Sequence, residues 1–443
     1  MLFADRSQDK FYSFTDNHYQ FFSSRLACSF IKFMWATPVY LRRSFTSLLL
    51  FPLFLSCCLV AAESEKAQAA KNQAFQQCIA GLQTRAAEAG VPEKIRKGVL
   101  SKASFLERII SYDRNQPEFV QTLAAYFNKR VTDWRVAKGR EMLVKHADFL
   151  ATLTATYGVP APYLIAFWGL ETNYGSYKGK IPTINSLVTL ACDKRRSEYF
   201  AGELVQALLL MDRENLSIED MQGSWAGAMG HTQFMPSAYM LYAKDGDNDG
   251  KKDLWNSELD ALASAANFLV KLGWKTGFKW GREVSLPKVF DYQLAGKDRR
   301  QPVSFWAKEG VRSASGHELA HSDVQSSLLI PSGHMGPTFL VYDNFDIILR
   351  WNNSEYYGIA VGHLADRIAG YKRLSKPFPD LPSFTVTEMR QLQTKLNELG
   401  FNVGKADGIL GPGTRSGIRG FQLSKGMIAD GYPSREVFNS AVE

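Results

Sequence analysis

The sequence predicts a mainly α-helical protein in two parts, a large one followed by a small helical module. Between Ala67 and Gly370 most strong apolar patterns have helical spacing, whereas strand-like runs are few and Thr338–Tyr342 is the clearest of them. Closely spaced prolines between Arg373 and Pro382 prevent regular helix and indicate an extended linker. With 443 residues, 45% hydrophobic and 22% charged, the chain is long enough for two or three globular domains.

The N-terminal region has the pattern of a secretory signal. Arg42 and Arg43 precede an apolar run from Leu48 to Val60, which small residues follow. This run is short for a bilayer span and leads into a polar stretch, so we expect no stable membrane span in the mature protein and export to the periplasm. A retained anchor is the alternative. We assign residues 1–62 to an N-terminal extension and signal peptide, with Met34 as the expected start.

The cysteines and the charge balance add two expectations. Cys57 and Cys58 follow residues that fit a lipid-attachment consensus poorly, so we expect no lipid anchor. Cys78 and Cys192 would remain after export, and the sequence leaves open whether they pair. The net charge of +8 suits an anionic partner. We expect no nucleic acid, because the basic residues are spread along the chain without an RNA-binding signature. The oligomeric state stays open.

Three helices are predicted most strongly in the larger part. The first covers Glu141–Tyr157 and ends at Gly158, the second covers Tyr199–Met211, and the third covers Leu259–Leu272 and ends at Gly273.

The smaller part, residues 383–443, predicts a compact module of three helices. Thr385 and Glu388 form a capping box at the start of the first helix. That helix places four apolar residues on one face, namely Met389, Leu392, Leu396 and Leu399. Thr414 is the expected cap of the second helix, and the third begins near Ser434.

The first candidate for chemistry is Glu171. Pro162 suits the first turn of a helix and Gly175 falls just past its expected end. Phe167 and Trp168 precede Glu171 by four and three positions, so their rings share its face of that helix. Apolar walls disfavour the ionised form of a carboxylate, which is what a general acid at neutral pH needs. A helix-end glutamate that points to solvent is the alternative.

A second candidate is the segment from Ser224 to Ser237, SWAGAMGHTQFMPS. It mixes small residues, which permit close backbone approach, with Ser224 and Gln233, whose side chains can bond to sugar hydroxyl and acetamido groups. Taken alone, the same pattern is also consistent with a tight structural loop.

Several spaced motifs together resemble one enzyme family. WGLETNYG, SWAGAMGHTQFMPSAY and NFDIILRWNNSEYYGIAVGHLADRI, in this order, resemble the lytic murein transglycosylase B family across 75–372. The resemblance implies an α+β lysozyme-like catalytic domain with added helical lobes, which we place at 63–375. The linker then covers 376–382. The string LQTKLNELGFNVGKADGILGPGTRSGIRGFQLSKGMIADGYPS resembles the peptidoglycan-binding module of many cell-wall enzymes, which we place at 383–443.

The family resemblance also implies site residues and a reaction. Glu171 matches the catalytic glutamate, and the matching substrate-binding residues are Ser224, Gln233, Trp351, Asn352 and Tyr357. Some members have Tyr at the position of Trp351, so the resemblance implies a sugar-stacking role there and no hydroxyl role. The implied reaction is lytic cleavage of the β-1,4 bond between N-acetylmuramic acid and N-acetylglucosamine in peptidoglycan strands, leaving 1,6-anhydro ends. It needs no catalytic cofactor. A hydrolytic muramidase and a non-catalytic wall-binding protein are the alternatives.

An acidic loop follows the EF-hand calcium pattern at its first, third, fifth, sixth and ninth positions. These positions hold Asp245, Asp247, Asp249, Gly250 and Asp253. The usual glutamate at the twelfth position is replaced by Asn256, and Asp260 matches the acidic residue that closes a longer loop in related transglycosylases. We expect a structural calcium site, and a solvated acidic turn is the alternative.

The string His317-Glu-Leu-Ala-His321 is a literal H-E-x-x-H zinc motif, but its context is wrong. Ser315 and Gly316 precede it where a helix would be needed to place both imidazoles on one face. We therefore expect a polar surface segment here.

Overall fold

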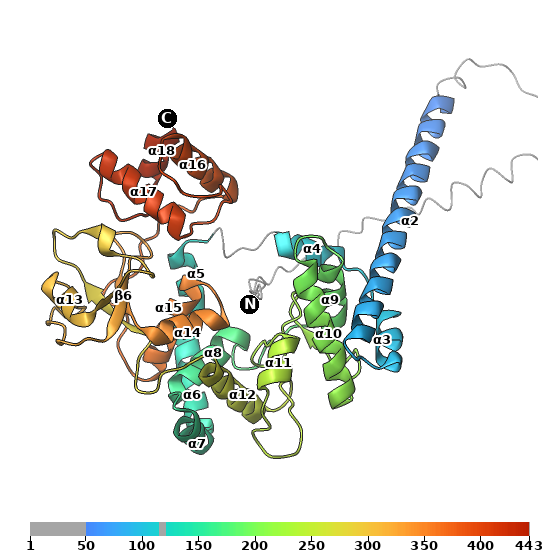
Figure 1. The fold of residues 1–443 in the computed structure, drawn as a ribbon, viewed down its shortest axis with the longest axis horizontal. Coiled ribbons are helices and arrows are strands. Elements are labelled where there is room, and N and C mark those ends of the chain that lie inside the picture. The colour runs from blue at the N-terminus through green and yellow to red at the C-terminus, as the bar shows by residue number, and fades with distance from the viewer. Residues whose placement is uncertain (1–49, 115–120, 443) are drawn as a thin grey trace, which may run out of the picture. The chain divides into compact units, whose positions relative to one another are not determined.

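The computed structural model describes residues 50–114 and 121–442. They fall into two compact units, one before Leu82 and one from Leu82 onward, and each is described by itself. Helix α2 (Leu50–Glu88) begins in the first unit (Figure 1). The expected start at Met34 and the basic pair Arg42 and Arg43 lie outside the described residues.

No described helix is by itself long and apolar enough to cross a membrane. Helices α7 (Ala147–Tyr157) and α8 (Ala161–Thr172) reach that composition only together, and they are bent by 110°. Because α8 is buried from Tyr163 to Thr172, its apolar character is that of a core helix.

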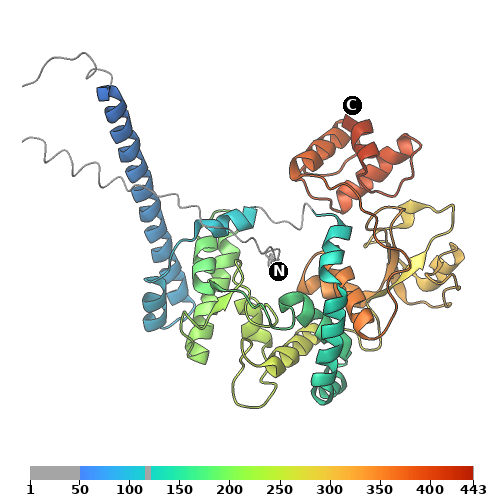
Figure 2. The same cartoon turned by 180° about the vertical axis from the view of Figure 1, so that it is seen from behind.

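The second unit contains most of the helices. Those before the sheet are α3 (Glu93–Leu100), α4 (Glu107–Arg114), α5 (Leu123–Arg130), α6 (Asp133–Lys145), α7, α8, α9 (Thr183–Ala191), α10 (Ser197–Glu214), α11 (Pro236–Tyr242) and α12 (Glu258–Lys271). Helices α13 (Val303–Lys308), α14 (Asp343–Trp351) and α15 (Glu355–Ile368) follow. Helix α8 packs against α6, α7, α12 and α15, and α9 packs against α10, as both views show (Figure 1, Figure 2).

The predicted helices are confirmed with one correction. Helix α10 contains the predicted Tyr199–Met211, and α12 ends before Gly273 as expected. The predicted helix Glu141–Tyr157 was wrong, because the chain breaks at His146, whose φ of −113° and ψ of 25° are not helical. The buried His146 ring lies beside Glu258 of α12, against which α7 packs. Packing of α7 against α12 therefore ends the first helix at His146, although the apolar pattern of the sequence continues through that position.

A five-stranded antiparallel sheet forms a separate lobe, in the order β4-β6-β7-β3-β5. Its strands are β3 (Gly281–Ser285), β4 (Arg300–Pro302), β5 (Arg312–Ser313), β6 (Gln325–Leu329) and β7 (Thr338–Val341). The predicted strand Thr338–Tyr342 is confirmed as β7, which pairs Leu340 with Arg282 and Leu328. Trp306 of α13 is fully buried in the core of this lobe. A two-stranded sheet of β1 (Ile181–Pro182) and β2 (Gln222–Gly223) joins two loops near α9.

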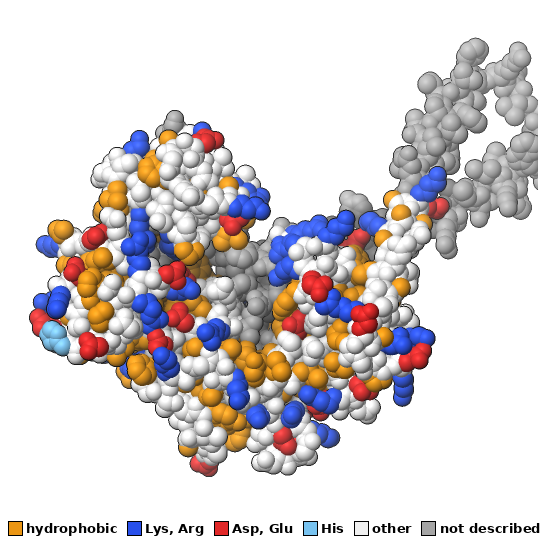
Figure 3. Space-filling model, in the orientation of Figure 1, with side chains coloured by type: hydrophobic (Ala, Val, Ile, Leu, Met, Phe, Trp, Pro, Cys, Tyr) orange, Lys and Arg blue, Asp and Glu red, His pale blue; other side chains and the backbone are white. Residues whose placement is uncertain are grey.

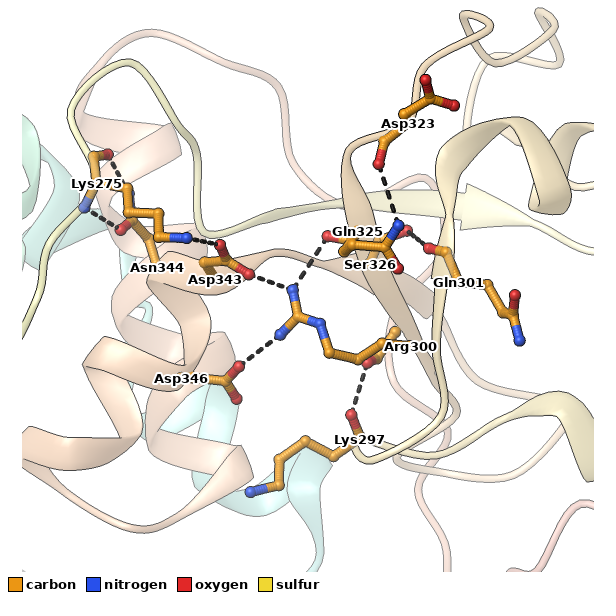
Figure 4. A network of polar contacts seen from close by, with 11 residues as sticks. Lys275, Lys297, Arg300, Gln301, Asp323, Gln325, Ser326, Asp343, Asn344 and Asp346 are labelled. Atoms are coloured by element: carbon orange, nitrogen blue, oxygen red, sulfur yellow. Dashed lines mark hydrogen bonds and ion pairs between the residues drawn. The ribbon is translucent and has the colours of Figure 1, made fainter.

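A polar network fastens the sheet to helix α14 (Figure 4). Arg300 of β4 donates from Nη1 to Asp346 Oδ2 at 2.8 Å and also pairs with Asp343, which Lys275 contacts from the other side. Asn344 accepts from the Lys275 backbone N–H at 2.8 Å and donates to its carbonyl at 2.9 Å. The start of α14 is thus tied both to the sheet and to the loop after α12.

The C-terminal module contains α16 (Val386–Glu398), α17 (Pro412–Ser424) and α18 (Arg435–Val442) around a core of its own. The capping box of Thr385 and Glu388 is confirmed. The predicted cap Thr414 was wrong, because Gly411 occupies that position and Pro412 starts the helix. Pro412 has no N–H to be capped, and Thr414 is instead buried, where its hydroxyl accepts from Gln393 at 2.9 Å.

The H-E-x-x-H string forms no helix. His317 and His321 are exposed, Glu318 bridges to Arg312 at the end of β5, and only Leu319 enters the core of the lobe. The expected surface segment is confirmed.

Candidate active site

Glu171 lies in the last turn of α8 and is only 8% exposed. The rings of Phe167 and Trp168 are buried beside it, as their spacing predicts. The helix ends at Asn173, which has a positive φ of 49°, and Gly175 continues the turn with φ of 80°. An added Cβ on Gly175 would come within 2.2 Å of the His231 ring, so only glycine fits this turn.

The hydroxyl of Tyr357 donates to Glu171 Oε1 at 2.6 Å. Tyr357 lies in the first turn of α15 and is 4% exposed. Ser354 caps this helix by accepting from the Tyr357 backbone N–H. Two helices that are far apart in the sequence therefore fix the position of one oxygen of the Glu171 carboxyl group through a short hydrogen bond.

Glu171 also lines a small cavity with mostly apolar walls. The other lining residues are Leu164, Phe167, Trp168, Thr232, Ala261, Leu262, Ala265 and Trp351. The Oγ1 atom of Thr232 is buried there without a hydrogen-bond partner. A buried hydroxyl that is left unpaired carries a desolvation cost, so it is available to a polar group of a ligand.

The predicted polar residues Ser224 and Gln233 hold the loop between β2 and α11. Ser224 Oγ accepts from the Ala228 backbone N–H at 3.1 Å. Gln233 has a positive φ of 49°, and its Nε2 donates to the carbonyls of Lys178 and Gly230 at 3.0 and 2.9 Å. The structural interpretation of this loop is thus supported for both side chains, and Gln233 keeps part of its surface exposed.

His231 was not singled out by the sequence, although it lies inside the loop motif. Trp168 Nε1 donates to His231 Nδ1 at 2.9 Å, and Thr172 Oγ1 donates to the His231 carbonyl at 3.0 Å. Burial, and then the nearby positive charge of Lys178, lower the pKa of His231 to about 4. The ring is therefore neutral near pH 7 and ties the loop to the helix that carries Glu171.

The structure separates the roles of Trp351 and Asn352. Trp351 is 4% exposed and packs against Phe167, Phe234 and Phe268, with ring centroids 4.5, 5.4 and 5.1 Å away. Its location favours a supporting role over sugar stacking. Asn352 ends α14, and its Oδ1 is buried without a hydrogen-bond partner among the described residues. An amide oxygen can accept a hydrogen bond from an N–H or O–H group.

The structure brings three of the five predicted metal ligands together. Oxygens of Asp245, Asp247 and Asp249 all lie within 4.8 Å of one another, and Asp245 Oδ1 is buried without a partner. Asp253 and Asp260 have other roles. Asp260 accepts from the backbone N–H groups of Gly246 and Asp253 at 2.7 and 2.6 Å, and Asp253 accepts from Trp255 and Asn256 at 2.9 and 3.0 Å.

The chain is similar to known proteins along most of its length. Residues 74–366 match the model of the family "Transglycosylase SLT domain", and residues 385–440 match "Putative peptidoglycan binding domain". The chain is 32% identical over 250 residues to membrane-bound lytic murein transglycosylase B of Escherichia coli strain K12. That alignment covers 55% of this chain and 66% of the relative.

Solved structures agree with this assignment. SltB3 from Pseudomonas aeruginosa, in complex with NAG-anhNAM-pentapeptide, matches with a TM-score of 0.80 at 39% identity, over 83% of this chain and 99% of that chain. Lytic transglycosylase Slt35 of Escherichia coli, in complex with calcium, matches with a TM-score of 0.57 at 30% identity, over 67% and 92% of the two chains. The predicted mainly α, lysozyme-like fold with a small C-terminal helical module is confirmed. The chain therefore belongs to the transglycosylase SLT family, whose member proteins include the lytic transglycosylases of peptidoglycan to which it is homologous.

Proposed function

We propose that this protein cleaves the β-1,4 bond between N-acetylmuramic acid and N-acetylglucosamine in peptidoglycan by lytic transglycosylation, with Glu171 as its acid and base. The observation that carries the proposal is the buried Glu171 carboxyl, held by the Tyr357 hydroxyl at 2.6 Å between apolar walls. A carboxyl group that two helices hold in place can pass a proton to and from a bound substrate.

In the proposed reaction Glu171 first donates a proton to the glycosidic oxygen as its bond to C1 of the muramic residue breaks. The carboxylate then accepts the proton of the muramic C6 hydroxyl while that oxygen forms its bond to C1. The products are a free hydroxyl on the leaving N-acetylglucosamine and a 1,6-anhydro ring, and no water is consumed. Tyr357 holds Glu171 in place through both proton transfers.

Two polar atoms support binding of an amide-bearing sugar. Thr232 Oγ1, in the wall of the Glu171 cavity, and Asn352 Oδ1, next in sequence to the cavity residue Trp351, have no hydrogen-bond partner among the described residues and suit N–H or hydroxyl groups of the substrate. Ser224 and Gln233 shape the adjoining loop through their bonds to backbone groups. Trp351 forms part of the apolar wall and packs against Phe167.

Product analysis tests this function. Mass spectrometry of muropeptides released from purified sacculi should show 1,6-anhydromuramic ends, which are one water lighter than hydrolytic products. Digestion in oxygen-18 water should leave the products unlabelled, because the C6 hydroxyl attacks within the same sugar. Labelled reducing ends would instead identify a hydrolytic muramidase, and an absence of products would indicate a wall-binding protein without activity.

We further propose that the acidic loop binds a structural calcium ion. Three clustered carboxylates repel one another unless a cation lies between them, and the unpaired Asp245 Oδ1 fits a ligand role. Asp253 and Asp260 would stabilise the loop through the hydrogen bonds that their carboxylates accept from backbone N–H groups. The proposed reaction itself uses no metal.

The proposed substrate also bears on location and on the C-terminal module. Peptidoglycan lies outside the cytoplasm, so we propose that the protein is exported to the periplasm by its N-terminal signal, without a lipid anchor. We propose that 383–443 holds the enzyme on the wall. Its deletion should weaken sedimentation with sacculi while cleavage of short soluble glycans persists. Equal loss of both would instead make the module part of the catalytic fold.

A further inference from the structure

A cleft lies where the sheet lobe meets the C-terminal module, and none of its lining residues lines the cavity beside Glu171. It encloses about 230 Å³. Its walls come from the loop before β4, the end of β6, Glu355 at the start of α15, and the first half of α17. Figure 3 shows Lys and Arg side chains gathered below the module, over the strands that are yellow in Figure 1.

The cleft is rich in positive charge. Four cations line it, namely Lys297, Arg299, Arg415 and Arg419. The lining carboxylates are Asp298 and Glu355, so four positive charges minus two negative ones leave a net charge of +2. The first turn of α17, which begins at Pro412, adds the partial positive charge of a helix N-terminus.

Arg419 carries part of the positive charge of the cleft. Its Nε is buried and has no hydrogen-bond partner among the described residues. Burial, and then the positive charges of Arg415 and Arg299, lower the pKa of Arg419, whereas the carboxylates of Asp430 and Glu355 act in the opposite direction. Closely placed like charges cost free energy, and an anion bound in the cleft would offset that cost.

Hydrogen bonds to Asp430 connect the two parts of the chain that form the cleft, the sheet lobe and the C-terminal module. His334 of the sheet lobe donates its backbone N–H to Asp430 Oδ2 at 2.9 Å, and its Nδ1 lies 2.7 Å from the same oxygen. Gln422 of α17 donates to the other oxygen of Asp430 at 2.9 Å. A Cβ added to Gly333 would come within 2.7 Å of Asp430, so the walls are in close contact.

We propose that this cleft binds the C-terminal carboxylate of a wall stem peptide; the inference rests on the proposed peptidoglycan substrate. The guanidinium groups of Arg415 and Arg419 match a carboxylate, which accepts paired N–H bonds. The volume is below the roughly 300–1,000 Å³ of a typical site for a whole small molecule, so it suits the end of a peptide better than a disaccharide. The sugars of the strand carry no comparable charge, whereas the stem peptides carry free carboxylates.

Calorimetry with a synthetic stem pentapeptide tests the proposal in the full-length protein. The double variant Arg415→Gln, Arg419→Gln should bind the peptide at least about tenfold more weakly than the unmodified protein, because two charge-assisted hydrogen bonds are lost. Lys405→Gln with Lys425→Gln is the matched control, since it removes two cations of the same module outside the cleft lining and should leave affinity unchanged. The same peptide amidated at its C-terminus should bind the unmodified protein about tenfold more weakly.

Three results would overturn the assignment. They are equal affinity of the double variant and the unmodified protein, equal affinity for free and amidated peptide, or equal affinity for inorganic phosphate and the peptide. A lowered melting temperature of the double variant would make its loss of binding ambiguous. The variant Arg299→Gln, on the opposite wall of the cleft, then tests the proposal, because it should weaken peptide binding in the same way. Cleavage of peptide-free glycan by the same preparations separates the two proposals. Cleavage without peptide binding would contradict only the proposed peptide site, whereas failure of cleavage would contradict the proposed function.

Discussion

Two groups of carboxylates in this chain have opposite surroundings. Glu171 is buried between apolar walls and accepts a hydrogen bond from the Tyr357 hydroxyl at 2.6 Å. Asp245, Asp247 and Asp249 are crowded together and exposed or half-exposed. The first arrangement suits a carboxyl group that exchanges a proton with a bound substrate, and the second suits carboxylates that share a cation. The environment of each carboxylate, and not its residue type, therefore decides its role.

The largest effect should come from Glu171→Gln, which keeps the shape of the side chain but cannot exchange a proton. We expect cleavage of sacculi to fall by about 10²- to 10⁴-fold, because acid and base catalysis each contribute on that scale. The melting temperature should change little. The matched control is Glu219→Gln, which changes an exposed glutamate in the same way. Near-normal activity of the Glu171 variant would remove this residue from the mechanism.

A smaller effect should come from Tyr357→Phe, which removes the hydroxyl that holds Glu171 Oε1. A hydrogen bond to a charged group contributes roughly 1.5–3 kcal/mol, so we expect kcat to fall by about tenfold or more. Tyr371→Phe changes an exposed tyrosine in the same way and serves as the control. An unchanged kcat of the Tyr357 variant would limit this side chain to packing.

His231 connects the Glu171 helix to the loop, and its burial predicts acid sensitivity. Its pKa of about 4 lies below the ordinary value of 6.5, so the unfolded chain takes up a proton first as the pH falls. The neutral His231 ring contributes fully to the free energy of unfolding above pH 6.5. This contribution is lost as the pH falls from 6.5 to 4, and the loss is about 3 kcal/mol at most.

Thermal unfolding across this pH range tests the role of His231. His231→Asn keeps an acceptor near the position of Nδ1 without titrating there, so its melting temperature should vary less with pH. His317→Asn, at an exposed histidine, should behave as the unmodified protein does. If the melting temperatures of the His231 and His317 variants depend on pH to the same degree, another group causes the acid sensitivity.

Local signals in the sequence explain which parts of the fold were predictable. The capping box at Thr385 and the helix α10 follow from caps and apolar spacing that lie within one element. The break at His146 depends on packing against α12, which the apolar pattern of α6 and α7 does not encode. Most of the sheet was missed because its strands have two to five residues and β6 is buried at consecutive positions instead of alternating ones.

The site was predictable for a different reason. Glu171 and Tyr357 are 186 positions apart, so no spacing rule joins them, and only the family resemblance placed both in one site. Thr232 and His231 lay inside the motif that was singled out, but their burial and their partners appear only in the fold. For Ser224 and Gln233, the structure shows bonds to the loop backbone that residue type alone could not reveal.

The smallest expected effect concerns the acidic loop, where calcium should stabilise the folded state by mass action. At a free concentration about 100 times Kd, binding adds about 2.7 kcal/mol, which corresponds to a rise in Tm of roughly 3 °C for a protein of this size. Asp245→Asn with Asp249→Asn should abolish the rise, because the remaining carboxylate cannot hold the ion alone. Asp212→Asn with Asp380→Asn removes two exposed charges outside the loop and should preserve the rise in Tm.

Cleavage by the unmodified enzyme should continue in chelator below the melting range, since the proposed proton transfers involve only Glu171 and the substrate. Identical melting curves in saturating calcium and in chelator would show that the loop is a solvated acidic turn, and the contrast with Glu171 would then be one of burial alone.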